Sequence, residues 1–391
     1  MKVSDRTRGV EYAIRDITAH AQKYKAAGKE IIYLNIGDPV KFDFKTPAHI
    51  KQALVDAVLN DENYYADSEG LPELRQAIME KESEKGLEIS QDDVLVTNGV
   101  SEGLDMTLAS IVDPNSEVLM PGPYYPPYSS YVKFYGGKPV EFRISEDGRP
   151  DLEDLRKKIT PRSRAICIIN PNNPTGEVFD RKSLQQLVDS ATEHDLYIIC
   201  DEIYDKIVFD SQFTGIGKVA KDAPVVLLNG FSKSYLMTGW RCGYICMNSN
   251  SKKLDEFRHD VPKLARVRIA ANLPVQIAAV QALKGPQDHI PIMIEKLRKR
   301  RDYVVKRLDA IGFHCKLPRG AFYVFPKIEL GTRWKDDQQF VLDLLDKTGV
   351  LTVHGSGFGA TFGSGSFRIV YLPPEDVLEK AMDKLEKFVK S

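Results

Sequence analysis

Five short apolar runs, separated by helix-like stretches, constrain the fold more than any other feature of this sequence. Turn residues bound each of them, and they occupy residues 94–97, 117–120, 165–169, 196–200 and 225–228. Continuous apolar runs of this length are typical of strands that are covered on both faces. Their alternation with helical segments, such as residues 183–193, predicts an α/β domain with a mostly parallel sheet.

The last hundred residues show a different pattern. Long amphipathic stretches at 292–310 and 338–348 surround shorter apolar runs at 322–325, 351–353 and 367–370, which predicts a second, smaller α+β domain. A length of 391 residues also corresponds to roughly two domains. We expect an N-terminal segment that contributes to the small domain, a large α/β domain and a C-terminal small domain, at residues 1–45, 46–285 and 286–391.

The composition excludes several classes of function. The net charge is −1, so no overall field favours nucleic acid or an anionic membrane. The one basic run, residues 296–301, is interpreted as a solvated helix face. No apolar run reaches transmembrane length, and the polar N-terminus lacks a signal-peptide core. Five cysteines without a CxxC pair and seven histidines without an HExxH motif predict a cytoplasmic protein without a metal site.

Lys233 follows the apolar run at 225–228, where it would lie just past the carboxyl end of a strand. Open α/β sheets bind their ligands at this edge. A desolvated lysine there has a lowered pKa and can attack a carbonyl to form a Schiff base. Arg241, eight residues later, carries a planar fork of donors that suits a phosphate. The two residues suggest pyridoxal phosphate, although a lysine in such a loop is more commonly solvated.

Two further segments supply groups that such a cofactor needs. The turn at residues 170–176 contains two prolines and could aim the amide of Asn173 at a cofactor hydroxyl. Asp201 follows the run at 196–200, and a carboxylate in such a place is costly to bury without a partner. A protonated pyridine nitrogen would be one, and the pairing would keep the ring a strong electron sink. A helix N-cap is the alternative role for Asp201. Tyr204 could share the target of Asn173.

Three more features complete the candidate site. Residues 97–104 link a strand to a helix, whose first backbone N–H groups could bind a phosphate. Tyr125, in a proline-rich loop after another strand, could stack on a flat ring, and Arg368 in a C-terminal strand could bind a carboxylate. Five different groups thus follow separate predicted strands: an amine, a carboxylate, an amide, a phosphate-binding loop and a stacking ring. This joint pattern is more specific than any one of the groups.

At this point the chain resembles the class I/II aminotransferases, which are pyridoxal-phosphate enzymes of fold type I, over nearly its whole length. The diagnostic pieces are Asn173-Pro174-Thr175-Gly176, Asp201-Glu202-Ile203-Tyr204, the segment from Ser232-Lys233 to Arg241, and Arg368. The resemblance implies that Lys233 carries the cofactor, Asp201 pairs with the pyridine nitrogen, Asn173 and Tyr204 contact the ring hydroxyl, and Tyr125 stacks on the ring. Catalysis is then assigned to Lys233, Asp201 and Tyr204.

The same resemblance implies how the phosphate and the substrate are held. The phosphate would lie against the backbone of Val100 and Ser101 and against Arg241. The α-carboxylate of an amino acid or 2-oxo acid would lie on Arg368, with help from Asn173 and the backbone of Gly37. Tyr65 matches a tyrosine that reaches the phosphate of a neighbouring subunit, which implies a homodimer with shared sites.

The chain departs from the family pattern at Gly230, where a phosphate-binding serine is common, and Ser232 or Ser101 could compensate. Cys242, after Arg241, replaces the usual aliphatic residue, which we interpret as neutral packing.

Within the family the likeness is greatest to archaeal-type alanine aminotransferases, in the stretches Val10–Asp16, Asn35–Phe42, His354–Gly359 and Tyr371–Pro374. We therefore expect L-alanine and 2-oxoglutarate as substrates. Arg15 and Arg268 are possible partners for the second carboxylate of glutamate. An aspartate or aromatic aminotransferase, a pyridoxal-phosphate lyase of the same fold and a regulator that only binds the ligand remain alternatives.

Overall fold

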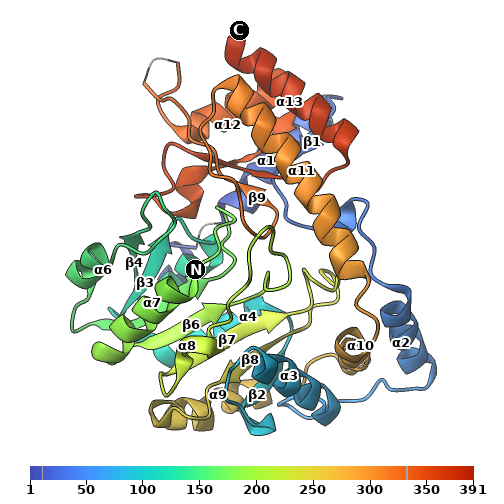
Figure 1. Cartoon of the computed structure of the whole chain (residues 1–391), viewed down its shortest axis with the longest axis vertical. Helices are drawn as coiled ribbons and strands as arrows, with labels where there is room; N and C mark the ends of the chain where they lie inside the picture. Colours follow the sequence, from blue (N-terminus) through green and yellow to red (C-terminus); the bar gives the residue numbers. More distant parts are fainter. Residues whose placement is uncertain (11, 332) are drawn as a thin grey trace.

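The computed structural model describes residues 1–10, 12–331 and 333–391 as two lobes, one above the other in Figure 1. Glu11, within the stretch Val10–Asp16, lies outside the described residues. The lower lobe is built around a large sheet, and the upper lobe carries the long C-terminal helices. This is the predicted α/β fold with a second, smaller α+β unit. The boundaries at residues 45/46 and 285/286 stay a prediction.

The large sheet has seven strands in the order β2-β8-β7-β6-β5-β3-β4. Strand β8 is antiparallel to both neighbours, and all other neighbours are parallel. The bounds are β2 (Val94–Thr97), β3 (Glu117–Gly122), β4 (Lys138–Arg143), β5 (Ser163–Ile169), β6 (Tyr197–Asp201), β7 (Val225–Gly230) and β8 (Gly243–Met247). All five apolar runs are strands, as predicted.

The sequence analysis missed β4 and β8. Strand β4 lies at the edge of the sheet, and its side chains are mostly half-buried or exposed, so it contains no continuous apolar run. Strand β8 is fully buried, and its residues 244–247 carry the same apolar signal as the predicted strands. It could therefore have been found from the sequence.

Helices cover both faces of this sheet, which explains why its strands other than the edge strand β4 are mostly apolar. Alternate residues of β7 belong to two different hydrophobic clusters: Val225 and Leu227 lie in one, and Val226 and Leu228 in the other. The helices of this lobe are α2 (Ala48–Leu59), α3 (Pro72–Glu84), α4 (Val100–Ile111), α5 (Pro126–Phe134), α6 (Leu152–Lys158), α7 (Arg181–Glu193), α8 (Gly217–Ala220), α9 (Asp255–Arg268) and α10 (Leu273–Lys284).

The upper lobe has its own hydrophobic cluster and two small sheets. Strand β1 (Ile32–Tyr33) pairs in parallel with β10 (Val350–Leu351), which brings the N-terminal segment to this lobe. Strands β11 (Val353–His354), β12 (Phe367–Val370) and β9 (Tyr323–Val324) form an antiparallel sheet in that order. The helices are α1 (Ala13–Ala26), α11 (His289–Ile311), α12 (Asp337–Thr348) and α13 (Glu375–Lys390).

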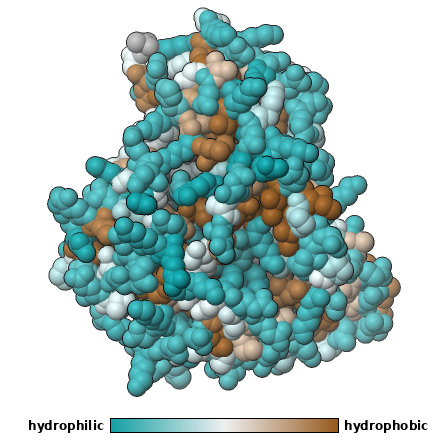
Figure 2. All heavy atoms as spheres, viewed as in Figure 1, coloured by the Kyte–Doolittle hydropathy of each residue, from teal (hydrophilic) through white to brown (hydrophobic). Residues whose placement is uncertain are grey.

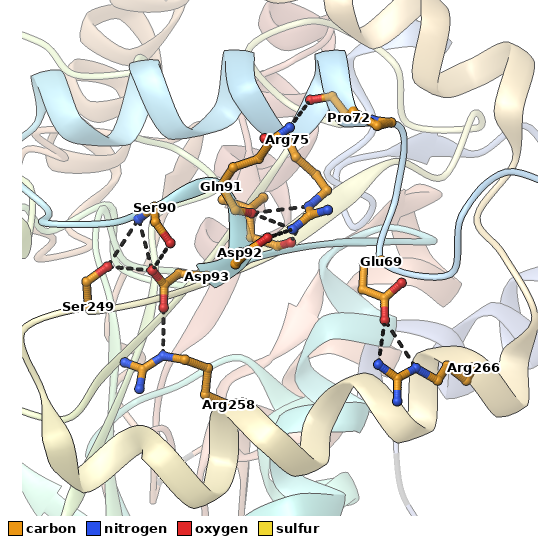
Figure 3. Close-up of polar contacts among 11 residues, drawn as sticks. Glu69, Pro72, Arg75, Ser90, Gln91, Asp92, Asp93, Ser249, Arg258 and Arg266 are labelled. Carbon is orange, nitrogen blue, oxygen red and sulfur yellow. Dashed lines mark hydrogen bonds and ion pairs between the residues drawn. The ribbon is translucent and has the colours of Figure 1, made fainter.

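Polar contacts fasten α3 and α9 to the 3₁₀ turn η3 (Gln91–Asp93), which leads into edge strand β2 (Figure 3). Arg258 of α9 donates from Nε to Asp93 Oδ1 at 2.7 Å, and Arg75 of α3 donates from Nη2 to the carbonyl of Gln91 at 2.7 Å. These contacts lie on the large lobe, away from the residues that line the main cavity described below. A substitution among them can therefore serve as a control for substitutions near the cavity.

The surface in view is mostly hydrophilic, and apolar side chains gather where the upper lobe meets the lower (Figure 2). Among the helices of the described residues, none combines the length and the apolar character that crossing a membrane requires.

Candidate active site

A cavity of about 1130 Å³ lies at the ends of the large-sheet strands and extends to the upper lobe. The sheet order explains what meets there. Because β5, β6 and β7 are parallel neighbours, the segments that follow them carry Asn173, Asp201 and Lys233 to one edge. The structure brings these predicted site residues to the cavity wall: Gly37, Val100, Ser101, Tyr125, Asn173, Asp201, Tyr204, Ser232, Lys233, Arg241 and Arg368.

Lys233 lies in the loop after β7 and points its amine into the interior of the site. Its Nζ donates to the carbonyl of Gly37 at 2.7 Å and lies 5.7 Å from the centre of the Phe322 ring. Burial lowers the pKa of Lys233 from 10.5 to about 8, because the charged form loses its hydration. About a tenth of the amine is therefore uncharged at pH 7, far more than for an ordinary lysine, and a nucleophile or base needs this uncharged form.

Asp201 ends strand β6 and is 4% exposed. Its Oδ1 accepts from the N–H of Ile203 at 3.0 Å, and its Oδ2 accepts from the hydroxyl of Tyr128 at 2.9 Å. Burial raises the pKa of Asp201 from 3.8 to about 6. No helix begins here, since residues 203–206 form a turn, so the alternative role of helix N-cap is wrong. Within the described residues, no lysine or arginine forms an ion pair with this carboxylate.

Arg368, at the second position of β12, is a buried cation. Its Nη1 donates to Asn173 Oδ1 at 2.9 Å and its Nη2 to the carbonyl of Asn35 at 2.5 Å. Its Nε is buried and has no hydrogen-bond partner in the part of the chain that the structure describes. Its guanidinium lies 4.5 Å from the centre of the Tyr323 ring. Among the described residues no carboxylate pairs with it, so the cavity presents an uncompensated positive charge that suits an anionic ligand.

Two pairs of tyrosine side chains line other parts of the cavity and contact each other through their hydroxyl groups. Tyr204 and Tyr323 lie with their hydroxyl oxygens 2.8 Å apart, and so do Tyr12 and Tyr125. Burial raises the pKa of both Tyr204 and Tyr125 well above 10, so these hydroxyls stay protonated and can donate. The pairs connect the large lobe with β9 and with the segment before α1.

The N-terminus of α4 and Arg241 form a second positive region of the cavity. Gly99 precedes α4 with φ of +82°, and Val100 and Ser101 open the helix. A side chain at Gly99 would collide with the guanidinium of Arg241, so the backbone and the cation approach closely. Backbone N–H groups at a helix N-terminus beside an arginine form a favourable anion site.

The structure also explains the departure at Gly230. A Cβ at this position would lie 2.9 Å from both the carbonyl oxygen of Cys242 and the Cα of Gly243 on β8. A serine therefore does not fit between β7 and β8. Ser232, two residues later, is buried and lines the cavity.

Three other predicted residues have different fates. Tyr65 is 79% exposed and does not line the cavity of its own chain. Arg268 also lies outside the cavity, where its Nη1 pairs with Glu102 Oε2 at 3.0 Å. Arg15, at the start of α1, lines the cavity. Of the two arginines considered for a second carboxylate, only Arg15 therefore meets the site.

Sequence reasoning missed the partners of the predicted residues. Tyr128 lies in α5, three residues after Tyr125, and this helical spacing behind a proline-rich loop is a signal that could have found it. Tyr323 lies in the run at 322–325, which was read only as a strand. Tyr12 lies in the stretch Val10–Asp16, whose sequence signals only a family likeness.

Comparison with known proteins agrees with this site. The family model "Aminotransferase class I and II" matches residues 29–385. Glutamate-pyruvate aminotransferase AlaA of Escherichia coli is 37% identical over 99% of this chain and 97% of that protein. Alanine aminotransferase of Mycobacterium tuberculosis is 35% identical over 99% of this chain and 92% of that protein.

Solved structures give the same result. An alanine aminotransferase from Pyrococcus furiosus superposes with a TM-score of 0.97 at 50% identity, and the match covers 100% of both chains. Aspartate aminotransferase from Thermus thermophilus with maleate has a TM-score of 0.90 at 32% identity, over 99% of this chain and 100% of that chain. The chain belongs to the class I and II aminotransferases, a family of enzymes that use pyridoxal phosphate and act on amino acids and 2-oxo acids.

The residues of this cavity fit that cofactor. Asp201 is a buried carboxylate that pairs with no cation of residues 1–10, 12–331 and 333–391, which suits a cationic ring nitrogen. The amine of Lys233 has the lowered pKa that an aldehyde-binding lysine needs. The α4 N-terminus with Arg241 suits a phosphate.

Proposed function

We propose that this protein is a pyridoxal-phosphate-dependent alanine aminotransferase, which interconverts L-alanine and 2-oxoglutarate with pyruvate and L-glutamate. The observation that carries the proposal is the meeting of Lys233, Asp201 and Arg368 in one cavity. The names of the E. coli, M. tuberculosis and P. furiosus relatives support alanine as the amino acid.

In this proposal each part of the cavity holds one part of the cofactor. Lys233 would hold the aldehyde carbon, Asp201 the ring nitrogen, Asn173 and Tyr204 the ring hydroxyl, and Tyr125 the face of the ring. The phosphate would bind to the group formed by Val100, Ser101, Ser232 and Arg241. When bound, pyridoxal phosphate supplies an electron-withdrawing ring that acidifies the Cα–H of an amino acid.

The chain's own groups then carry out the proton transfer. Arg368 and Asn173 would hold the α-carboxylate, which fixes the orientation of the Cα–H. The Nζ of Lys233 would take that proton as a base and return a proton as an acid, and a pKa of about 8 suits both directions near neutral pH. Tyr128 would keep Asp201 oriented and ionised, because its hydroxyl donates to Oδ2.

One site must accept both a methyl group and a side-chain carboxylate. Arg15 at the cavity wall is our candidate for the carboxylate of glutamate and 2-oxoglutarate. The same arginine also favours a second candidate function, an aspartate aminotransferase. A relative from Methanocaldococcus jannaschii with 32% identity over 97% of this chain bears the name probable aspartate aminotransferase. An aromatic aminotransferase and a lyase of the same fold are further alternatives.

A substrate panel tests the proposal. Alanine, aspartate, tyrosine and kynurenine would each be offered with 2-oxoglutarate, and glutamate formation would be measured. In parallel reactions without the keto acid, release of ammonia would be measured. We expect alanine to give the highest kcat/KM and Lys233→Ala to abolish turnover. Preference for aspartate or tyrosine would move the function to the alternatives, and product release without a keto acid would indicate a lyase. Turnover in Lys233→Ala would refute the role of that lysine, and cofactor binding without any turnover would indicate a regulator.

A homodimer with shared sites is part of the proposal. Tyr64 and Tyr65 are exposed, and so are Val55, Val58 and Leu59 of the neighbouring helix α2. Exposed apolar side chains gathered in this way favour contact with another subunit. Tyr65 would then reach the phosphate region of the neighbouring cavity. The cytoplasmic location stays a prediction.

A further inference from the structure

A cluster of buried charges lies behind the turn that carries Asp201 and Tyr204. It consists of Lys81 and Glu82 in helix α3, Lys85 at the end of that helix, and Glu202 and Asp205 in the turn; we call it the lysine cluster. The side chains of the two lysines are 12% and 18% exposed, and those of the three carboxylates 0 to 3%. None of the five residues lines the cavity, so the site described above does not use them.

The contacts within the lysine cluster are short. Lys85 Nζ lies 2.7 Å from Glu202 Oε2, 3.0 Å from Asp205 Oδ2 and 2.6 Å from Glu82 Oε2. Lys81 Nζ lies 3.0 Å from Asp205 Oδ2 and 3.2 Å from Glu82 Oε1. Two ammonium groups therefore serve three buried carboxylates. Burial raises the pKa of Glu202, whereas the lysines hold the pKa of Asp205 and of Glu82 below the usual range. Removing either lysine would increase the excess of buried negative charge.

The turn at residues 201–205 divides its side chains between the cavity and the lysine cluster. Asp201 and Tyr204 line the cavity, whereas Glu202 and Asp205 form ion pairs with the lysines of α3. Both lysines thus hold the opposite side of the short segment that presents the carboxylate and the hydroxyl to the site. The backbone N–H of Ile216 also donates to Glu202 Oε1 at 2.7 Å, which fixes this carboxylate from a third side.

The lysine cluster also reaches the strand that leads to Lys233. Asn229, near the end of β7, donates from Nδ2 to Asp205 Oδ2 at 3.0 Å and accepts the N–H of Gly230 on its Oδ1 at 2.7 Å. Asp205 therefore links the end of β6 to the end of β7, four residues before Lys233. One set of ion pairs thus braces the two segments that carry the carboxylate and the amine of the site.

We propose that Lys81 and Lys85 are positioning residues, which fix Asp201 and Tyr204 at the cofactor site through their ion pairs with Glu202 and Asp205. This inference rests on the proposed function. Displacement of the turn by a fraction of an ångström would misplace the carboxylate, and supporting groups that lock such a geometry determine how well a site works.

Lys85→Met tests the proposal, with Lys85→Arg as the conservative variant and Arg258→Met as the matched control. Arg258 also pairs with a buried carboxylate, Asp93, but outside the cavity (Figure 3). Two quantities would be measured in each protein. The first is the hydrogen-exchange rate of the amides of residues 203 and 205 without cofactor, and the second is the Kd for pyridoxal phosphate.

We expect Lys85→Met to raise both the exchange rate and the Kd at least tenfold, and Lys85→Arg to restore both to within about threefold of wild type. Arg258→Met should lower the midpoint of thermal unfolding and leave both quantities within about twofold. Values for Lys85→Met that match Arg258→Met would show that the lysine only stabilises the fold, and the proposal would be overturned.

Two provisions keep the result decisive. If Lys85→Met does not fold, Asp205→Asn removes the carboxylate that pairs with both lysines at nearly constant volume, and we expect a rise of about threefold or more in both quantities; wild-type values would overturn the proposal. Hydrogen exchange needs no cofactor, so the bracing of the turn is judged even if the wild-type protein fails to bind pyridoxal phosphate. That failure would refute the proposed function by itself.

Discussion

Replacing Asp201 by asparagine should stabilise the cofactor-free protein at neutral pH while it weakens binding of pyridoxal phosphate. Burial raises the pKa of this carboxyl from 3.8 to about 6, against the hydrogen bonds from Ile203 and Tyr128. Since one pKa unit corresponds to about 1.4 kcal/mol, keeping the buried group ionised costs the folded state roughly 3 kcal/mol. Asparagine carries no charge and avoids this cost.

The sign of the pH dependence follows from linkage. Below pH 3.8 the carboxyl is protonated in both the folded and the unfolded chain, so ionisation costs nothing there. Between 3.8 and about 6 the folded protein binds more protons than the unfolded chain, so this group makes the protein less stable as the pH rises. Above about pH 6 the folded state bears the full free-energy cost of the ionised carboxylate. The stability advantage of Asp201→Asn should therefore grow by roughly 3 kcal/mol from about pH 4 to about pH 8.

Urea unfolding of the cofactor-free proteins at several pH values measures this difference. Comparing the two proteins across pH cancels any constant change in hydrogen bonding, and Asp222→Asn, at an exposed turn, is the matched control. With cofactor present, the variant should lose affinity for pyridoxal phosphate, because the partner of the ring nitrogen is gone. A difference in unfolding free energy that stays constant over the whole pH range would refute the reasoning.

Three further predictions address other parts of the site. Arg368→Leu should lower kcat/KM for alanine by about a hundredfold or more, because two charge-assisted hydrogen bonds to the substrate carboxylate are lost. The Kd for pyridoxal phosphate should stay within about threefold of wild type, and unchanged alanine kinetics would contradict the role of Arg368. Gly230→Ser should destabilise the protein by about 1–3 kcal/mol in thermal unfolding, because the added side chain overpacks the space between β7 and β8. Gly239→Ser is the control, since a Cβ there meets nothing within 4 Å, and it should leave the stability unchanged. Equal stability of the two variants would contradict the packing argument. Tyr65→Phe should raise the Kd for pyridoxal phosphate about fivefold if its hydroxyl serves the neighbouring subunit, with Tyr64→Phe as the control, and an unchanged Kd would exclude that role.

The predictable part of this protein depends on local signals. The apolar runs located the strands, and the polar residues just after them, Asn173, Asp201 and Lys233, located the site, because neighbouring parallel strands end at one edge of a sheet. Residues whose role depends on a distant partner were missed. Tyr128 meets Asp201 across 73 positions of sequence, and Lys85 meets Glu202 across 117.

The sequence by itself determined which segments are strands covered on both faces, and which residue types follow them. Burial of alternate side chains on the two faces of a strand leaves its mark on consecutive residues, so a single chain displays it. Only the tertiary structure decided the strand order with its antiparallel β8, the exclusion of a serine at position 230, and the choice of Arg15 over Arg268 at the cavity. It also decided the pKa values of Lys233 and Asp201, because desolvation and pairing depend on groups that folding brings in from far along the chain.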